Sequence, residues 1–233
     1  MLNKCNQFLR TYFHSSDIAE DYLVLEAGGG SFSHFETPGS SEMISLDIEH
    51  SQLVKNAAAT YRIQADLHTN PLIPESVDMI ICFNVIEHLE APELALKQLS
   101  QALKPGGLMV VGCPVRSSLK GIITRLTPIG FHRWYYRWIV GKKDRGEGHF
   151  DVFPTPFKPI VDATPLRRWC EAEHLDVLFF ESYDGAKAYE ISYGSVMRRI
   201  ASLPYYVLTT LGRIFSLGRW KADESDLLMV VVK

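Results

Sequence analysis

The sequence predicts an α/β fold that is built on a mostly parallel sheet. From residue 22 to residue 113, short apolar runs that are typical of strands alternate with segments of helical periodicity. This alternation indicates parallel strands joined by right-handed crossovers. The first run, Leu23–Ala27, leads into three consecutive glycines. With 233 residues and 46% hydrophobic content, the chain is long enough to form one domain with a substantial core.

The expected elements follow in chain order. Residues 2–16 repeat apolar side chains at helical spacing and predict an N-terminal helix that covers the core or a cofactor. Strands are expected at 22–27, 43–47, 61–65, 77–83, 108–113, 177–182 and 226–232, and helices at 50–59, 91–103 and 164–173. Pro38-Gly39 leaves room for a short helix in the first crossover, and Lys104-Pro105-Gly106-Gly107 should stop the helix before the fifth strand. Thr164 should cap its helix, with Pro165 at the first helical position.

Two insertions interrupt this rhythm, at 115–163 and at 189–221. We expect both to belong to a single domain, residues 1–233, and not to fold alone. Strands five and six should run parallel, so the insertions that follow them should stand together over a bound ligand. Residues 115–145 hold eight Lys and Arg against one acid and residues 191–222 hold five against none, whereas residues 1–114 hold six against fourteen. The sequence therefore predicts an acidic body beneath a basic lid.

Carboxylates end the first two strands. Glu26 stands just before Gly28-Gly29-Gly30, and Asp47 closes the second strand about twenty residues later. Glycine has no Cβ, so a ligand can lie directly against the turn. A carboxylate at the end of the second strand suits a ribose. A carboxylate before the turn suits hydroxyls, an amine or a positive charge, and it would repel the pyrophosphate of a nicotinamide cofactor. Ser33 also departs from the third small position of the dinucleotide pattern.

Five motifs, in order and spacing, resemble class I S-adenosylmethionine (SAM)-dependent methyltransferases of the type 11 or type 23 kind. They are Glu26-Ala27-Gly28-Gly29-Gly30, Asp47, Ala65-Asp66-Leu67, Asn84-Val85-Ile86-Glu87-His88-Leu89 and Leu103-Lys104-Pro105-Gly106-Gly107. The resemblance covers residues 20–115 and, more loosely, 164–184 and 225–233. It departs at Phe32, where the family has a glycine. It implies a Rossmann-like seven-stranded sheet of order 3-2-1-4-5-7-6 with an antiparallel last strand, and SAM as cofactor.

The resemblance also implies a cofactor site. Glu26 would lie beneath the amino acid end of SAM, and the backbone of Gly28, Gly29 and Gly30 would contact the cofactor. Asp47 would bind the ribose hydroxyls, and Ile48 would pack on the adenine ring. Asp66 would accept from the adenine amino group, with Leu67 beside it, and Asn84 would lie near the methyl donor. Simpler roles stay open for most of these residues. Glu26 and Asp47 could be strand-end caps, Asp66 an Asx-turn residue, and Ile48 and Leu67 ordinary core.

Methyl transfer from a sulfonium mainly requires alignment of donor and acceptor, where orientation can supply roughly 7–11 kcal/mol. A hydroxyl acceptor also needs a base to remove its proton. The candidates are His88, which follows strand four, and His132, His149 and Asp151 in the first insertion. A structural role for His88 is equally open. No His, Asp or Glu cluster has metal-ligand spacing, so a metal-dependent mechanism is disfavoured.

The sequence thus predicts a SAM-dependent methyltransferase for an anionic small-molecule, glycan or lipid-linked acceptor, with methylation at oxygen. The alternative is a SAM-binding but catalytically silent scaffold, which Phe32 and the short first crossover would favour. The apolar stripe of the second insertion and the aromatic-basic run 132–138 predict either a lid core or peripheral membrane contact through 132–139 and 196–220. Nucleic acid is not expected as a partner. We expect a cytoplasmic protein with four buried, reduced cysteines.

Overall fold

The computed structural model describes residues 2–15, 22–30, 35–39, 41–69, 72–128, 130, 155–185 and 203–233. Several residues that the sequence singles out lie outside these ranges. They are Phe32 and Ser33 of the glycine loop, the candidate catalytic residues His132, His149 and Asp151, and the aromatic-basic run 132–138.

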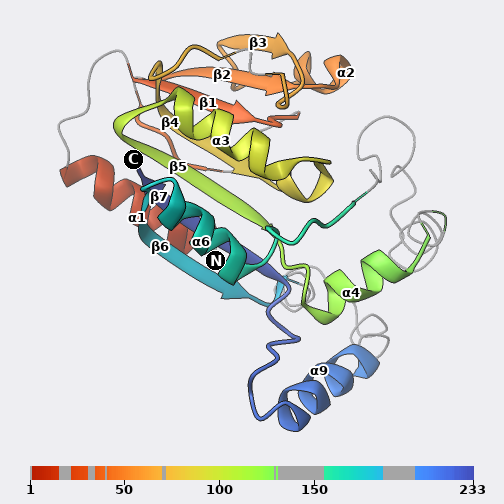
Figure 1. The fold of residues 1–233 in the computed structure, drawn as a ribbon. Coiled ribbons are helices and arrows are strands. Elements are labelled where there is room, and N and C mark those ends of the chain that lie inside the picture. The colour runs from red at the N-terminus through yellow and green to blue at the C-terminus, as the bar shows by residue number, and fades with distance from the viewer. Residues whose placement is uncertain are drawn as a thin grey trace.

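Seven strands form one sheet that is flanked by helices (Figure 1). The elements are α1 (Leu2–Ser15), β1 (Leu23–Ala27), β2 (Glu42–Asp47), α2 (His50–Leu53), β3 (Tyr61–Gln64), β4 (Val77–Phe83), the 3-10 turn η1 (Ile86–His88), α3 (Pro92–Ala102), β5 (Leu103–Pro114), α4 (Leu119–Leu126), α6 (Ala163–Ala172), β6 (Asp176–Tyr183), α9 (Leu203–Phe215) and β7 (Asp226–Val232). The strand order is β3-β2-β1-β4-β5-β7-β6, as the sequence predicts.

Strands β1 to β5 pair in parallel, whereas β7 runs antiparallel to both β5 and β6. Pro114 at the end of β5 faces Asp226 at the start of β7, and Asp226 in turn faces Tyr183 at the end of β6. The two chain segments that the sequence marks as insertions therefore leave the sheet at one edge, the carboxyl edge of the parallel strands. Cofactors and substrates bind at this edge in open α/β sheets.

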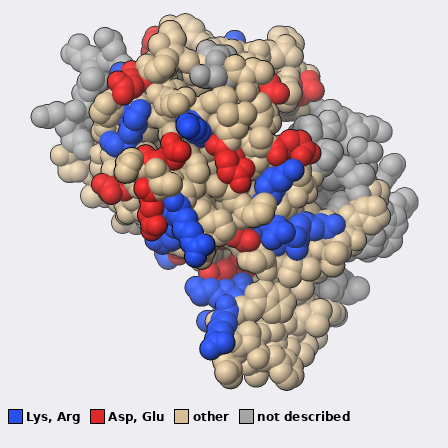
Figure 2. Space-filling model, viewed as in Figure 1, with Lys and Arg blue, Asp and Glu red and all other residues tan. Residues whose placement is uncertain are grey.

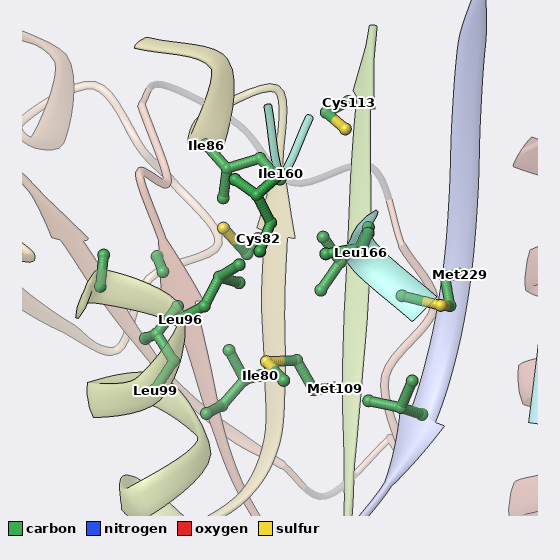
Figure 3. Close-up of a cluster of buried hydrophobic side chains, with 14 of the residues drawn as sticks. Ile80, Cys82, Ile86, Leu96, Leu99, Met109, Cys113, Ile160, Leu166 and Met229 are labelled. Atoms are coloured by element: carbon green, nitrogen blue, oxygen red, sulfur yellow. The ribbon is translucent and has the colours of Figure 1, made fainter. Parts of the chain in front are cut away.

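The inner strands β1, β4, β5 and β7 are buried on both faces, because they are runs of mostly apolar residues, whereas the edge strands β3 and β6 are partly exposed. One face packs against α3 and α6, and Figure 3 shows the side chains that fill this core, among them Ile80 of β4, Leu96 of α3 and Leu166 of α6. The other face carries α1, whose Cys5 and Leu9 are fully buried. The N-terminal helix thus covers the core.

All four cysteines are free thiols in the interior. Burial raises the pKa of Cys5 and Cys82 to about 12 and that of Cys170 to about 11, so these thiols stay protonated at neutral pH.

Helix α2 ends six residues earlier than the predicted helix 50–59. Its last carbonyls are bound from β3, because Arg62 donates from Nε to the Leu53 carbonyl at 2.9 Å and from Nη2 to the Asn56 carbonyl. Asn56 is fully buried, and its side chain turns toward the glycine loop. These tertiary bonds replace the helical ones that the sequence pattern allowed.

Two other boundaries differ from the prediction. Lys104-Pro105-Gly106-Gly107 does end the preceding helix, but it belongs to β5, where Gly106 donates its N–H to the carbonyl of Lys233 at 2.8 Å. Helix α6 begins at Ala163, so Thr164 is not its cap. Asp162 holds the capping position, but its carboxylate accepts instead from the N–H and hydroxyl of Ser117, at 2.8 and 2.7 Å.

Candidate functional site

The glycine turn after β1 is fastened to the end of β2. The N–H groups of Gly28 and Gly29 both donate to the carbonyl of Leu46, at 2.7 and 3.2 Å. The N–H of Gly30 donates to Oδ2 of Asp47 at 3.0 Å. Gly28 has a φ of +68°, and a Cβ there would lie 2.3 Å from Cγ2 of Val85. The turn therefore needs glycine at this position on two separate grounds.

Glu26 lies beneath this turn and is 5% exposed. The side-chain N–H groups of Asn56 face Oε2 of Glu26 at 3.4 Å, Oγ of Ser45 at 3.2 Å and the carbonyl of Gly29 at 3.3 Å. This buried amide ties the acid to both β2 and the turn. Asn56 was not predicted as a site residue, because it stands in a segment with a helical pattern and without any motif around it.

Asp47 occupies the rim of the turn. Its two carboxylate oxygens accept from the N–H groups of Gly30 and Glu49, the latter at 2.8 Å. Each oxygen can accept a further hydrogen bond, and the side chain is partly exposed. The neighbouring Ile48 is 65% exposed, so its side chain is accessible for contact with a flat ring.

Asp66 follows β3 at the same edge. Its Oδ1 accepts from the backbone N–H of His68 at 2.9 Å and lies 2.7 Å from Nδ1 of that residue. Nε2 of His68 accepts from the N–H of Ala91, which places the ring proton on Nδ1. These bonds, the backbone one first, hold the pKa of Asp66 below its ordinary value, so the carboxylate is an acceptor at neutral pH. Leu67, by contrast, is 8% exposed and belongs to the hydrophobic core.

The hydrogen bonds of the glycine turn indicate which class of cofactor fits the carboxyl edge. A dinucleotide phosphate needs free backbone N–H groups, but those of Gly28, Gly29 and Gly30 all donate within the protein. The carboxylates of Asp47 and Asp66 suit instead the ribose hydroxyls and the amino group of a nucleoside that has no phosphate and carries a cationic sulfonium. The described residues thus fit SAM.

Asn84 and the turn η1 continue this edge beyond β4. Asn84 is exposed and has a φ of +58°, a conformation in which its N–H donates to the carbonyl of Gly112 at 2.8 Å. A residue with positive φ directly after a sheet strand is typical of a functional edge. The structure therefore brings Asn84 to the carboxyl edge at which the glycine turn and Asp47 lie.

Glu87 and His88 stand side by side in η1. Nδ1 of His88 lies 3.4 Å from Oγ1 of Thr155, and its Nε2 lies 3.7 Å from Oε1 of Glu87. Glu87 is 3% exposed, and its Oε2 has no hydrogen-bond partner among the described residues. Burial raises the pKa of Glu87 to about 8, with Lys120 lowering it and Asp226 raising it. A buried acid that is neutral at pH 7 therefore lies beside the candidate base. In the sequence, Glu87 stands out only as part of the motif that follows strand four.

A further ion pair lies at the same edge, where β5 ends and β7 begins. Nζ of Lys120 in α4 lies 3.0 Å from Oδ1 of Asp226, which is 9% exposed at the start of β7. Gly185 after β6 donates its N–H to Oγ of Ser225 at 2.9 Å. Among the residues that the structure describes, no three His, Cys, Asp or Glu side chains converge as a metal ion would require.

The seven-stranded sheet has the fold of class I SAM-dependent methyltransferases, and the carboxylates at its carboxyl edge fit that cofactor. Residues 25–111 match the family model described as a methyltransferase domain. This match and the seven-stranded sheet confirm the predicted class of protein and SAM as its cofactor. One relative, an uncharacterised protein of Methanocaldococcus jannaschii, is 28% identical over 100 residues, which are 43% of this chain and 44% of that protein. The match thus spans less than half of that relative's length.

Solved structures share the fold. A SAM-dependent methyltransferase of Archaeoglobus fulgidus has a TM-score of 0.54 at 16% identity, covering 100% of this chain and 95% of that one. Phosphoethanolamine N-methyltransferase 2 of Haemonchus contortus, in complex with SAM, has a TM-score of 0.54 at 14% identity, covering 98% of this chain and 52% of that one. The [4+2]-cyclase SpnF has a TM-score of 0.53 at 13% identity, covering 98% and 81%.

Proposed function

We propose that the protein transfers the methyl group of SAM to an oxygen atom of an anionic small-molecule, glycan or lipid-linked acceptor. The observation that carries the cofactor half of this proposal is the bond between the Gly30 N–H and Oδ2 of Asp47. This bond fixes a carboxylate beside a turn whose N–H groups are all engaged. Bound SAM supplies a methyl group on a sulfonium, which is a good leaving group, and the protein must align the acceptor with it.

The proposed cofactor contacts are those that the family resemblance implies. Asp47 would accept from the ribose hydroxyls, Ile48 would cover one face of the adenine, and Asp66, held as a carboxylate by His68, would accept from the adenine amino group. Glu26 and Asn56 would hold Gly29 from below. Leu67 lies in the core, so its part would be to support Asp66 from within.

For the acceptor, the proposal rests on charge. The two insertions, 115–163 and 189–221, would form a lid of one single domain over the acceptor. Figure 2 shows acidic and basic side chains mixed over the sheet and its helices, with Lys and Arg along α4 and beside α9. A basic surface at the carboxyl edge attracts an anionic substrate. Contact of 132–139 and 196–220 with a membrane belongs to the same proposal, because a lipid-linked acceptor is met at a bilayer.

His88 is the described candidate for the base that an oxygen acceptor requires. It lies at the carboxyl edge between Thr155 and Glu87, which would orient its ring. His132 and His149 stay predictions for the same role.

Replacing Asp47 by asparagine should weaken binding of S-adenosylhomocysteine about tenfold to hundredfold, because one carboxylate oxygen that accepts from the ribose is lost. Isothermal titration calorimetry measures the affinity. E42Q is a matched control, since Glu42 begins the same strand at the opposite edge of the sheet and is exposed. Equal affinity of D47N and E42Q for the ligand would contradict the assignment of Asp47.

Transfer of labelled methyl from SAM to fractions of a cell extract tests the activity itself. We expect labelled product in the acidic fractions from anion exchange, and its loss in H88A with unchanged S-adenosylhomocysteine affinity. Binding without any transfer would instead support the silent scaffold, and the shared fold of the cyclase SpnF shows that this architecture is not restricted to methyltransferases.

A further inference from the structure

Helix α9 exposes most of its apolar side chains, whereas its buried residue is polar. Leu203, Val207, Leu208, Leu211, Ile214 and Phe215 all face solvent. At 100° per residue these six positions fall within an arc of about 140° on one side of the helix. The buried position of the helix is Thr209, which is 4% exposed. This is the reverse of a helix that packs on a protein core.

The opposite side of α9 attaches the helix to the rest of the protein. A Cβ at Gly212 would lie 2.5 Å from the Trp220 ring, so the ring packs directly on the helix backbone. Nε1 of Trp220 donates to the carbonyl of Ser117 at 2.7 Å, just before α4. Arg213 lies 3.5 Å from Asp223. Because the Gly212 side of the helix packs against Trp220, the apolar arc faces outward.

Helix α4 and the turn after α9 carry further exposed leucines. Leu126 is 77% exposed at its end, and Leu217, in the turn after α9, is 87% exposed. Figure 1 shows α4 and α9 both projecting away from the sheet, on the side where β5 ends. We call the six apolar residues of α9, together with Leu126 and Leu217, the apolar tip.

The charges around the apolar tip are mainly basic. Residues 119–128 and 203–222 together hold five Lys and Arg and no Asp or Glu. Lys120, Arg213 and Lys221 pair with acids of the segment 223–226. Arg125 and Arg219 have no acidic partner in the part of the chain that the structure describes. Figure 2 shows the α9 end as a largely uncharged surface that Lys and Arg side chains border.

We propose that the apolar tip docks on an anionic lipid bilayer, with its apolar arc among the acyl chains and its arginines at the headgroups. A large apolar surface with a basic border is typical of helices that lie in a membrane interface. The surface along α9 is only shallowly hollowed, beside Tyr206, Val207, Thr210 and Leu211.

The charges favour a bilayer over a second copy of the chain. A two-fold dimer through this surface would bring the same unpaired arginines of both copies together, which is unfavourable. The described residues contain no helix that is long and apolar enough to span a bilayer. The proposed contact is therefore with the membrane surface.

This inference deepens the membrane contact of the proposed function, but its evidence comes from α4 and α9 and its test does not require methyl transfer. Lys120 of α4 pairs with Asp226 at the carboxyl edge of the sheet, so docking would bring that edge toward the bilayer. A lipid-linked anionic acceptor could then reach the cofactor site without leaving the membrane surface.

Co-sedimentation of the full chain with vesicles tests the proposal. We expect binding to phosphatidylcholine vesicles that contain about one-third phosphatidylglycerol, and weaker binding to pure phosphatidylcholine or at high salt. The double variant F215E/L217E and the single variant L126E should each lower the affinity at least about tenfold. R125E/R219E should lower binding to the anionic vesicles and reduce its salt dependence.

The matched control is I73E, because Ile73 is 73% exposed but precedes β4 at the opposite edge of the sheet. The thermal shift with S-adenosylhomocysteine, measured on every variant, reports an intact cofactor site independently of lipid. L126E keeps the test valid if the double variant fails to fold. The proposal is overturned if the wild-type chain stays in the supernatant, or if I73E loses as much binding as the tip variants. It is equally overturned if the tip variants only convert a dimer to a monomer in size-exclusion chromatography.

Discussion

Replacing Gly28 by alanine should lower the free energy of unfolding by about 2–5 kcal/mol. The added methyl group would lie 2.3 Å from Cγ2 of Val85, and overpacking of this kind costs about 1–3 kcal/mol. The φ of +68° adds about 1–2 kcal/mol for a residue that carries a Cβ. At this chain length the melting temperature should fall by about 5–15 °C. The displaced turn should also lose most of its affinity for S-adenosylhomocysteine.

A second substitution separates the two causes. V85A removes the methyl groups that the new Cβ would meet, so G28A/V85A should be more stable than the sum of the two single effects predicts. G39A is the control, because Gly39 has no positive φ and no neighbour within 4 Å of an added Cβ. Additive effects of G28A and V85A in thermal denaturation would show that the turn does not rest on Val85.

Glu87→Gln should remove a pH dependence of stability that reaches several kcal/mol. The pKa of Glu87 is raised from 4.5 to about 8 in the folded protein, mainly because the carboxyl is buried. Between these two values the folded state holds a proton that the unfolded state has released. The contribution is fully present below about pH 4.5 and is lost, at about 1.4 kcal/mol per pH unit, as the pH rises toward 8.

Glutamine is neutral at every pH, so the E87Q variant should lack this slope and be more stable than the wild-type protein at pH 8. Urea unfolding at pH 5 and pH 8 measures the difference. E90Q is the control, since the side chain of Glu90 is 79% exposed three residues away. If E87Q and the wild-type protein lose stability equally between pH 5 and pH 8, Glu87 is already ionised in the fold.

Strands were the elements most fully determined by sequence. The apolar runs 77–83 and 226–232 are strands with the predicted bounds, because they lie in the centre of the sheet, where burial on both faces demands continuous apolar side chains. Helix ends were less predictable, because they depend on distant partners. Arg62 of β3 binds the carbonyl of Leu53, where α2 ends. The carboxylate of Asp162 binds Ser117 and therefore does not cap α6.

The candidate site divides in the same way. Glu26, Asp47 and Asp66 follow consecutive strands, so their common edge follows from the sheet topology. The burial of Glu87 could not be predicted, because a single 3-10 turn has no periodicity that would show which side chain faces inward. The pair of Lys120 and Asp226 joins residues 106 positions apart. The outward face of α9 likewise depends on Trp220 packing on Gly212.

The cofactor-binding edge is tested most directly by the thermal shift of the full chain with saturating S-adenosylhomocysteine, with NAD as the comparison. Ligand at about 100 times its dissociation constant adds about 2.7 kcal/mol, which at this size raises the melting temperature by about 5–10 °C. We expect this shift with the nucleoside, its reduction in D47N, and none with NAD. A shift with NAD and none with S-adenosylhomocysteine would contradict the account.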